Sequence, residues 1–368
     1  MKVLNFRSLL LAAFATVSLT AFAGQTYHVT DLGSLGRPTS EGTAVNNSGV
    51  AVGRGAITGG YFRAFYNDGA MHALGTFGGY QSTATAINAS GQLAGYASTG
   101  PINHAFLYSG GVMTDLGTLG GANKRSQAYG INDSGWVVGE AGFTGSAAYH
   151  AFVYHNGAMH DLGTLANSTD SFYKNSYAFD INNSGKIVGQ SERSGVLQPH
   201  AFLSYNGVMT DLGTLGGAVS SANSISDTNQ IAGTSQITSS SAMHAFKYVS
   251  GTMTDLGVLA GGTNSYGQGI NSAGLVVGMS ESSLGSKAFI YRDGAMTSLN
   301  TLFDATSPVT NMTEAYGISD TGYIVGTGYI NGDRRAILLT PNAVPEPGTW
   351  AALGLGALAV LRKRRQKA

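Results

Sequence analysis

The sequence has no cysteine and few charged residues. None of the 368 residues is Cys, and only 11% are Asp, Glu, Lys or Arg. Disulfide bonds, thiolate zinc sites, iron–sulfur clusters and cysteine nucleophiles are therefore excluded. The scarcity of charge and the presence of 54 glycines argue against an ordinary helical enzyme.

The central part of the chain also lacks a run of basic residues. Residues 24–343 contain 13 Lys and Arg against 19 Asp and Glu, a net charge of about −6. Proteins that bind nucleic acid neutralise its phosphates with clustered Lys and Arg. We therefore expect no nucleic acid as a partner, and no motif predicts a cofactor.

The first 23 residues are typical of a secretory signal peptide. Lys2 and Arg7 precede an apolar run from Leu9 to Phe22, and Ala21-Phe22-Ala23 has the small-x-small pattern of a cleavage site. The run is short and contains three hydroxyl side chains, so it does not predict a membrane span. We expect the mature chain to begin near residue 24 and to be exported.

The C-terminal residues 344–368 have a different pattern. Pro345-Glu346-Pro347 leads into an apolar stretch from Thr349 to Leu361, and a basic cluster follows at Arg362–Arg365. As a helix the apolar stretch would be about 20 Å long, short of the roughly 30 Å hydrocarbon core. It predicts a thin or transient transmembrane helix whose basic end stays in the cytoplasm.

Seven copies of a repeat fill residues 24–343. Each copy has a turn of the type Ile-Asn-x-Ser-Gly followed by a short apolar run that ends in glycine, and the intervals between these glycines are 42 to 50 residues. The seven glycines are Gly53, Gly95, Gly139, Gly189, Gly233, Gly278 and Gly326. An Ala-Phe step and a segment of the type Met-Thr-Asp-Leu-Gly or a relative of it follow in the first six units, and the seventh has Ala336-Ile337.

Each unit therefore holds four short β-type segments, which we call strands A to D. Strands A and B are joined by Asn-x-Ser-Gly, and C and D by steps such as Asn206-Gly207 and Asp293-Gly294. These pairs supply the positive φ angles that tight hairpins need. Four antiparallel strands at this period predict an all-β, seven-bladed β-propeller.

The two ends of the repeat region indicate a closed ring. The seventh unit stops at Thr340-Pro341 without a strand D, and an unassigned strand D lies at Tyr27–Gly33. We predict that Thr30–Leu32 pairs with Ala336–Leu338 in the last blade, which would leave no open sheet edge. An open solenoid would require atypical capping units, and the sequence shows none.

The recurring motifs of the repeat resemble the extracellular repeats of the HAF family. That family is named for the tripeptide His-Ala-Phe, which is found here at residues 104–106, 150–152, 200–202 and 244–246. Arg63, Lys287 and Arg335 replace His in the other three units. The C-terminal segment resembles the PEP-CTERM sorting signal through Pro345, Glu346 and Pro347. That resemblance implies export in a Gram-negative bacterium that makes exopolysaccharide, with an exosortase-type protease as partner. Neither resemblance implies a catalytic residue set.

A recurring His–Asp spacing is the strongest pattern with chemical content. In four units a His precedes an Asp by eleven residues: His104 and Asp115, His150 and Asp161, His200 and Asp211, His244 and Asp255. In two of the three units where His is replaced the Asp is replaced too, since Arg63 goes with Ala73 and Lys287 with Ser298, whereas Arg335 would pair with Asp31 if the ring closes as predicted. We interpret the pairs as structural contacts across the C–D hairpin. Metal binding is the alternative, but it needs three or more ligands at one point.

Three other patterns are weaker indications of a binding or catalytic site. The Asn-x-Ser-Gly turns have too few carboxylates for calcium. The Gly-Gly steps lack the strand and helix context of a phosphate loop. Glu140, Glu192 and Glu281 each follow a strand B, and paired carboxylates could hydrolyse a glycosidic bond, but the sequence does not bring them together.

The loops predict where binding takes place. The A–B and C–D turns are nearly constant, so we expect a plain face there, whereas the B–C and D–A loops vary and share the opposite face. Exposed aromatic side chains on variable loops suit contacts with sugar rings or proteins, although any of them could simply pack against the loop. The candidates are Tyr61, Phe62, Tyr80, Phe143, Phe172, Tyr173 and Tyr266.

These patterns leave two functions open. The first is a non-enzymatic protein of the cell surface or matrix that binds polysaccharide or another protein through the variable-loop face. The second is a propeller hydrolase or lyase that acts on matrix polysaccharide. Two or three carboxylates around the central channel on the variable-loop face would favour the enzyme, and aromatic and uncharged polar groups there would favour the binding protein.

Overall fold

The computed structural model of the chain describes residues 25–343, except 144, 167–173, 239 and 310. The chain divides into two compact units, His28–Thr340 and a second that combines Met1–Tyr27 with Pro341–Ala368. The predicted signal peptide, sorting tail and transmembrane helix lie outside the described residues. In the second unit the Asn342 amide nitrogen donates to the Thr26 carbonyl at 3.0 Å.

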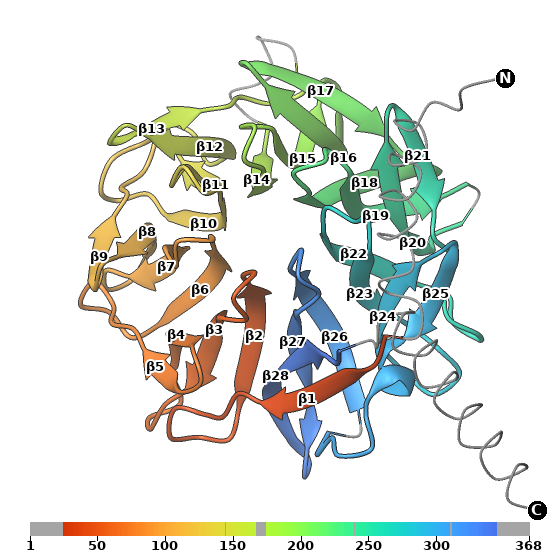
Figure 1. Ribbon diagram of the computed structural model, residues 1–368. Coiled ribbons are helices and arrows are strands. Elements are labelled where there is room, and N and C mark those ends of the chain that lie inside the picture. Colours follow the sequence, from red (N-terminus) through yellow and green to blue (C-terminus); the bar gives the residue numbers. More distant parts are fainter. Residues whose placement is uncertain (1–24, 144, 167–173, 239, 310, 344–368) are drawn as a thin grey trace, which may run out of the picture. The chain divides into compact units, whose positions relative to one another are not determined.

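The unit His28–Thr340 is a ring of seven four-stranded antiparallel sheets (Figure 1), as the repeat predicts. Each sheet is one blade, with strand A innermost and strand D outermost. The strands A are β2 (Ser40–Val45), β6 (Ser82–Ile87), β10 (Ser126–Ile131), β14 (Ser176–Ile181), β18 (Gly216–Ile225), β22 (Ser265–Ile270) and β26 (Asn311–Ile318). The strands B are β3 (Ala51–Ala56), β7 (Leu93–Ser98), β11 (Val137–Gly142), β15 (Ile187–Arg193), β19 (Ile231–Ile237), β23 (Val276–Ser280) and β27 (Ile324–Ile330).

The two outer strands of each blade complete the sheets. The strands C are β4 (Phe62–Asn67), β8 (Asn103–Ser109), β12 (Tyr149–His155), β16 (Val196–Tyr205), β20 (Met243–Val249), β24 (Lys287–Arg292) and β28 (Asp333–Pro341). The strands D are β5 (Met71–Ala73), β9 (Val112–Asp115), β13 (Ala158–Asp161), β17 (Val208–Gly213), β21 (Thr252–Asp255), β25 (Ala295–Ser298) and, from the N-terminal end, β1 (Tyr27–Asp31). A 3₁₀ turn, η2 (Leu299–Leu302), follows β25.

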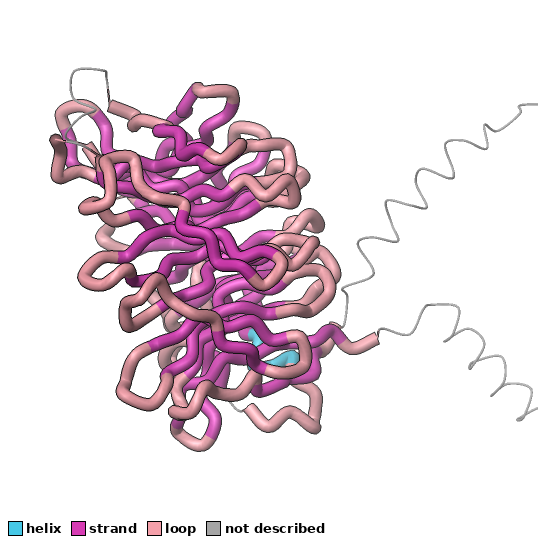
Figure 2. The backbone as a smooth tube through the Cα atoms, turned by 90° about the vertical axis from the view of Figure 1, so that its left-hand side faces the viewer, coloured by secondary structure: helices cyan, strands magenta, loops and turns pink. Residues whose placement is uncertain are grey.

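The strands run between two faces of the ring, which Figure 2 shows from the side. We call the face with the A–B and C–D turns the turn face, and the face with the B–C and D–A loops the loop face. The C–D turns are tight, as at Asn206-Gly207, where φ is 51° and 78°. These are the left-handed angles that a two-residue hairpin turn requires.

Glycine in each strand B allows the blade to form. In blade 3 a Cβ on Gly139 would lie 1.9 Å from the Gln127 carbonyl oxygen of strand A, and the other six glycines have the same conflict. The Phe of each Ala-Phe step covers this position, as Phe106 does over Gly95. Phe106, Phe152 and their counterparts are fully buried, and the apolar core lies between neighbouring blades.

Two series of hydrogen bonds join neighbouring blades. At the loop-face end a buried Ser on strand A accepts from an Ala nitrogen of the preceding blade, as Ser126 Oγ does from Ala105 at 2.9 Å. The same hydroxyl donates to the Gly117 carbonyl at 2.5 Å. At the turn-face end an Asn amide donates to a carbonyl of the next blade. The donors are Asn46, Asn88, Asn132, Asn182 and Asn271.

The N-terminal strand closes the ring. β1 is the fourth strand of the sheet formed by β26, β27 and β28, and the Leu32 nitrogen donates to the Ala336 carbonyl at 3.0 Å. The predicted closure agrees with this pairing. Val29 and Leu32 are buried, so the closing strand also contributes apolar side chains to the core.

Candidate functional site

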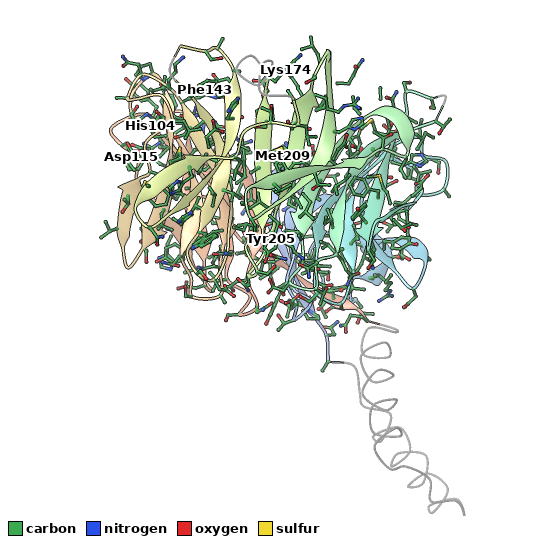
Figure 3. The ribbon with its side chains drawn as sticks, turned by 90° about the horizontal axis from the view of Figure 1, so that it is seen from above. His104, Asp115, Phe143, Lys174, Tyr205 and Met209 are labelled. Carbon is green, nitrogen blue, oxygen red and sulfur yellow. The ribbon has the colours of Figure 1, made fainter. Side chains whose placement is uncertain are left out.

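The structure brings together all four predicted His–Asp pairs. Asp115 lies opposite Phe106 in the β8–β9 ladder, so His104 reaches it diagonally (Figure 3). In each pair the His Nδ1 lies 2.8 to 2.9 Å from an Asp oxygen: His104–Asp115, His150–Asp161, His200–Asp211 and His244–Asp255. A second bond runs from a glycine nitrogen to each Asp, as from Gly117 to Asp115 at 2.8 Å. Each pair therefore joins the C–D hairpin to the start of the next loop.

The units without His make different contacts at the same position. Arg335 pairs with Asp31 of β1 at 3.0 Å, and Lys287 Nζ donates to the Asn311 side chain at 2.8 Å. Arg63 donates to the Tyr80 carbonyl, and Ala73 stands opposite Phe65 where blades 2 to 5 have an Asp. The position thus carries a structural contact in each blade, with a cation in place of His in three of them.

Metal-ligand and carboxylate chemistry find little support in the described part of the chain. There, no three His, Asp or Glu residues gather in a way that could hold a metal ion. Glu192 and Glu281 each bind the backbone nitrogen and side-chain amide of an Asn in the D–A loop, at 3.1 Å. Both carboxylates therefore fasten loops of their own blade.

Glu140 is different, because it is a buried carboxylate of β11. Only 1% of its surface is exposed, and its Oε1 lies 2.5 Å from Arg125 Nη2. Burial raises the pKa of the Glu140 carboxyl, and the charge of Arg125 offsets part of this. The Arg125 guanidinium lies 4.5 Å above the Tyr149 ring. The pair holds Arg125 in place at the loop face.

The predicted aromatic residues fall into distinct environments. Phe143 packs on His150 with 4.3 Å between ring centroids, and the Phe62 ring lies 4.7 Å from the Arg54 guanidinium carbon. Tyr266 lies in β22, the innermost strand of blade 6, and not on a loop, because the loop before it is shorter than the sequence suggested. Phe172 and Tyr173 lie outside the described residues.

Tyr61 and Tyr80 form an exposed aromatic pair on the loop face. Their rings stack with centroids 5.0 Å apart at 19°, and 44% of Tyr61 and 63% of Tyr80 is exposed. The pair lines a pocket of about 320 Å³ with Gln81, Ser98, Gly100, Pro101, Ile102, Asn103 and Arg125. Tyr61 comes from the B–C loop of blade 1 and Tyr80 from the following D–A loop. The ring arrangement brings these loops together with the next B–C loop.

The central channel holds polar groups that the sequence did not reveal. Every strand A has a register shift at the same place, as between Ala128 and Gly130. A bulge of this kind redirects the extra side chain, and these residues line a hollow of about 220 Å³. They are Thr43, Thr85, Tyr129, Phe179, Asn223, Gln268 and Tyr316. The hydrophobic alternation of strand A gives no sign of a bulge, so sequence patterns miss this set.

Asp180 lies in the same hollow and is held by three donors. Its oxygens accept from the Ile181 and Ile225 nitrogens at 2.8 and 2.9 Å and from Ser224 Oγ at 2.9 Å. Its depth in the ring raises the pKa of this carboxyl to about 6, although these hydrogen bonds act in the opposite direction.

The turn face is also less plain than expected. A hollow of about 200 Å³ lies there, lined by the A–B turns of all seven blades. An acidic residue in these turns accepts from a backbone nitrogen of the preceding turn. Asp133, which follows Asn132, accepts from Ala89 at 2.9 Å, and Asp227, which follows Ser226, accepts from Asn183 at 2.8 Å. The acidic residue that several of these turns contain is the feature of the sequence from which these contacts could have been predicted. These carboxylates are used to join blades.

The comparisons with known proteins identify one motif. Residues 343–365 match the family model for the PEP-CTERM protein-sorting motif, which indicates an exported protein attached at the surface. Pro345, Glu346 and Pro347 fall within the match and outside the described residues. No curated protein matches the sequence. Among the described residues, no helix is long and apolar enough to span a membrane.

Solved structures match the chain at low sequence identity. The β-propeller domain of the Trilobed protease from Pyrococcus furiosus, described as having an open velcro topology, is 10% identical with a TM-score of 0.52, over 86% of this chain and 95% of that one. TolB from Acinetobacter baumannii is 12% identical with a TM-score of 0.44, over 88% of this chain, which spans 64% of TolB. Together the motif and the fold identify the chain as a seven-bladed β-propeller with a PEP-CTERM sorting motif.

Proposed function

We propose that the protein is a non-enzymatic, surface-exported propeller that binds polysaccharide through its loop face. The stacked and exposed pair Tyr61 and Tyr80 carries this proposal. Stacking occupies one side of each ring and leaves apolar surface open to solvent. The C–H faces of a sugar ring pack well on such surface, while polar groups beside it bind hydroxyls.

The lining of the pocket supports the same ligand. Gln81, Asn103 and Arg125 provide amide and guanidinium groups beside the tyrosines, and sugar hydroxyls both donate and accept hydrogen bonds. The volume of about 320 Å³ falls at the low end of the range of roughly 300–1,000 Å³ for small-ligand sites. A short stretch of a polysaccharide chain fits this description better than a folded protein surface does.

The location expected for the protein, outside the cell, is consistent with this role. The sorting motif at residues 343–365 supports an exosortase-type protease as processing partner, with the C-terminal segment in the membrane before cleavage. The resemblance of the repeats to the HAF family agrees with an extracellular location. A surface protein of this kind would meet exopolysaccharide where it is made.

The proposal is tested with purified full-length protein on a glycan array, followed by affinity measurements on the glycans that bind. We expect Tyr80→Ala and Tyr61→Ala each to weaken binding about fivefold, since stacking on an aromatic side chain contributes on the order of 1 kcal/mol.

Tyr205→Ala is the matched control for Tyr61→Ala. Tyr205 has the same exposed fraction of 44% and lies near the opposite face from Phe143 (Figure 3). Unchanged affinity in both loop-face variants, or binding to a protein but to no glycan, would show that this proposal is wrong.

A further inference from the structure

Four arginines surround the aromatic residues of the loop face in blades 1 and 2. Arg125 lines the Tyr61–Tyr80 pocket, and Arg54 lies over the Phe62 ring. Arg63 donates to the Tyr80 carbonyl, and a Cβ on Gly60, next to Tyr61, would lie 3.7 Å from Arg37 Nη1. Arg125 thus lines the pocket itself, while Arg63 lies beside Tyr80 and Arg37 beside the residue that precedes Tyr61.

Two of these arginines have acidic partners and two do not. Arg54 pairs with Glu41 at 2.6 Å and Arg125 with Glu140 at 2.5 Å. For Arg37 and Arg63, no carboxylate lies within 4 Å among the residues that the structure describes. Arg63 donates to the carbonyls of Phe62 and Tyr80. Its remaining N–H groups are therefore available to a ligand.

The lack of a partner for Arg63 follows from the repeat. Blades 2 to 5 place a His with an Asp at this position, and blade 7 places Arg335 with Asp31 at 3.0 Å. Blade 1 has the cation, but Ala73 replaces the acid. This position has an acidic partner in five blades, but Arg63 in blade 1, which also carries Tyr61, and Lys287 in blade 6 have none.

The charges near the pocket leave two of the four arginines without compensation. Glu41 and Glu140 offset the charges of Arg54 and Arg125. The positive charge that remains beside the tyrosines is therefore that of Arg37 and Arg63. Such a local positive charge attracts an anion to this region.

We infer that the Tyr61–Tyr80 site takes an anionic, uronic-acid polysaccharide. This rests on the proposed function and adds the chemical class of the sugar. The ring of one residue stacks on the tyrosines, and its carboxylate accepts hydrogen bonds from Arg63 and Arg37. The planar guanidinium matches a carboxylate in a two-point arrangement, which an uncharged sugar hydroxyl does not offer.

The test compares two polymers with the same sugar backbone, one with ionised carboxylates and one with neutral methyl esters in their place. Full-length protein is titrated with polygalacturonate and with its fully methyl-esterified form, at low and high salt. We expect the acid to bind about tenfold or more tightly than the ester, because hydrogen bonds to charged groups are the stronger ones. The preference should shrink as salt screens the charges.

Variants then locate the preference. Arg63→Gln and Arg37→Gln should each weaken binding of the acid several-fold and leave binding of the ester unchanged, whereas Tyr80→Ala should weaken both. Arg292→Gln, which removes one positive charge at the C–D turn of blade 6, is the charge-matched control and should leave both affinities unchanged.

The outcomes separate this inference from the function on which it rests. Equal affinity for acid and ester, with both lost in Tyr80→Ala, would overturn the anionic preference and keep polysaccharide binding. A preference for the acid that Arg63→Gln and Arg37→Gln leave intact would also overturn the inference. Binding of neither polymer, together with a glycan array that shows no ligand, would overturn both proposals.

Discussion

At the scale of single residues, the repeat reuses a few side chains for the same contact in most of the blades. The strand-B glycine accommodates a strand-A carbonyl, and the Phe of the next strand fills the space beside it. The Ser at the start of strand A and the Asn at its end join one blade to the next. Asp180 departs from this pattern, because it places a carboxyl in the channel at a position where the other bulges carry no acid.

Asp180 should make stability depend on pH in an unusual direction. Its folded pKa of about 6 is above the model value of 3.8, so the folded state binds a proton more tightly than the unfolded state does. Stability is then lost as pH rises from about 4 to 6 and is constant above that. We expect a loss of about 2 kcal/mol, discounted from the full shift because water reaching the hollow solvates the carboxylate.

The comparison with Asp180→Asn isolates this effect from all other titrating groups. The free energy of unfolding is measured by chemical denaturation from pH 4 to 8 for both proteins. The difference between them should change through pH 4–6 in favour of the variant as pH rises. A difference that stays constant across this range would contradict the raised pKa.

At the scale of elements, the turns within the hairpins and the longer loops on the opposite face have different roles. The A–B and C–D turns are set by short, local sequence signals and recur almost unchanged. The B–C and D–A loops differ between blades and bring side chains from distant repeats together, as with Tyr61, Tyr80 and Arg125. β1 is the element with the longest connection in sequence, since it pairs with β28 at the other end of the chain.

The closing strand should contribute to the stability of the whole ring. Leu32→Pro removes the hydrogen bond to the Ala336 carbonyl and the side chain of a buried residue, whereas Leu32→Ala removes the side chain alone. We expect Leu32→Pro to melt several degrees below Leu32→Ala, with faster hydrogen exchange in β28, because a proline in a strand lacks the donor.

Identical melting temperatures and exchange rates in the two variants would show that the β1–β28 bond does not hold the ring together. The same experiment measures the contribution of the Leu32 side chain to stability. The free energy of unfolding of Leu32→Ala should be about 2–4 kcal/mol lower than that of the unchanged protein, as for other large-to-small substitutions in a core.

At the scale of the whole molecule, the sorting signal and the proposed binding site lie in different parts of the chain. The propeller is contained in His28–Thr340, and the sorting motif matches residues 343–365. We propose that the motif directs export and attachment while the loop face binds polysaccharide.

Deletion of residues 344–368 tests this division. The melting temperature of the protein should be unchanged, since strand β28 ends at Pro341. Its distribution between membrane, surface and medium should shift toward the medium, as measured by fractionation of cells that express either form. Either a large fall in melting temperature or an unaltered distribution would count against the proposed sorting role.

The sequence by itself determined the number of blades, the four strands of each, the closing strand and the sorting motif. Each of these depends on local signals repeated at a fixed spacing, such as Asn-Gly turns and the strand-B glycines, or on a short linear motif. The eleven-residue His–Asp spacing was readable for the same reason, because a tight hairpin fixes its own register.

Only the tertiary structure decided which loop residues meet and which strand residues face the channel. The Tyr61–Tyr80 pair, the pairing of Arg125 with Glu140 and the strand-A bulges depend on how neighbouring blades pack and twist. Contacts between repeats are set by packing across the ring, and no spacing along the chain encodes them. For this reason the candidate site followed from the fold, while the fold itself followed from the repeat.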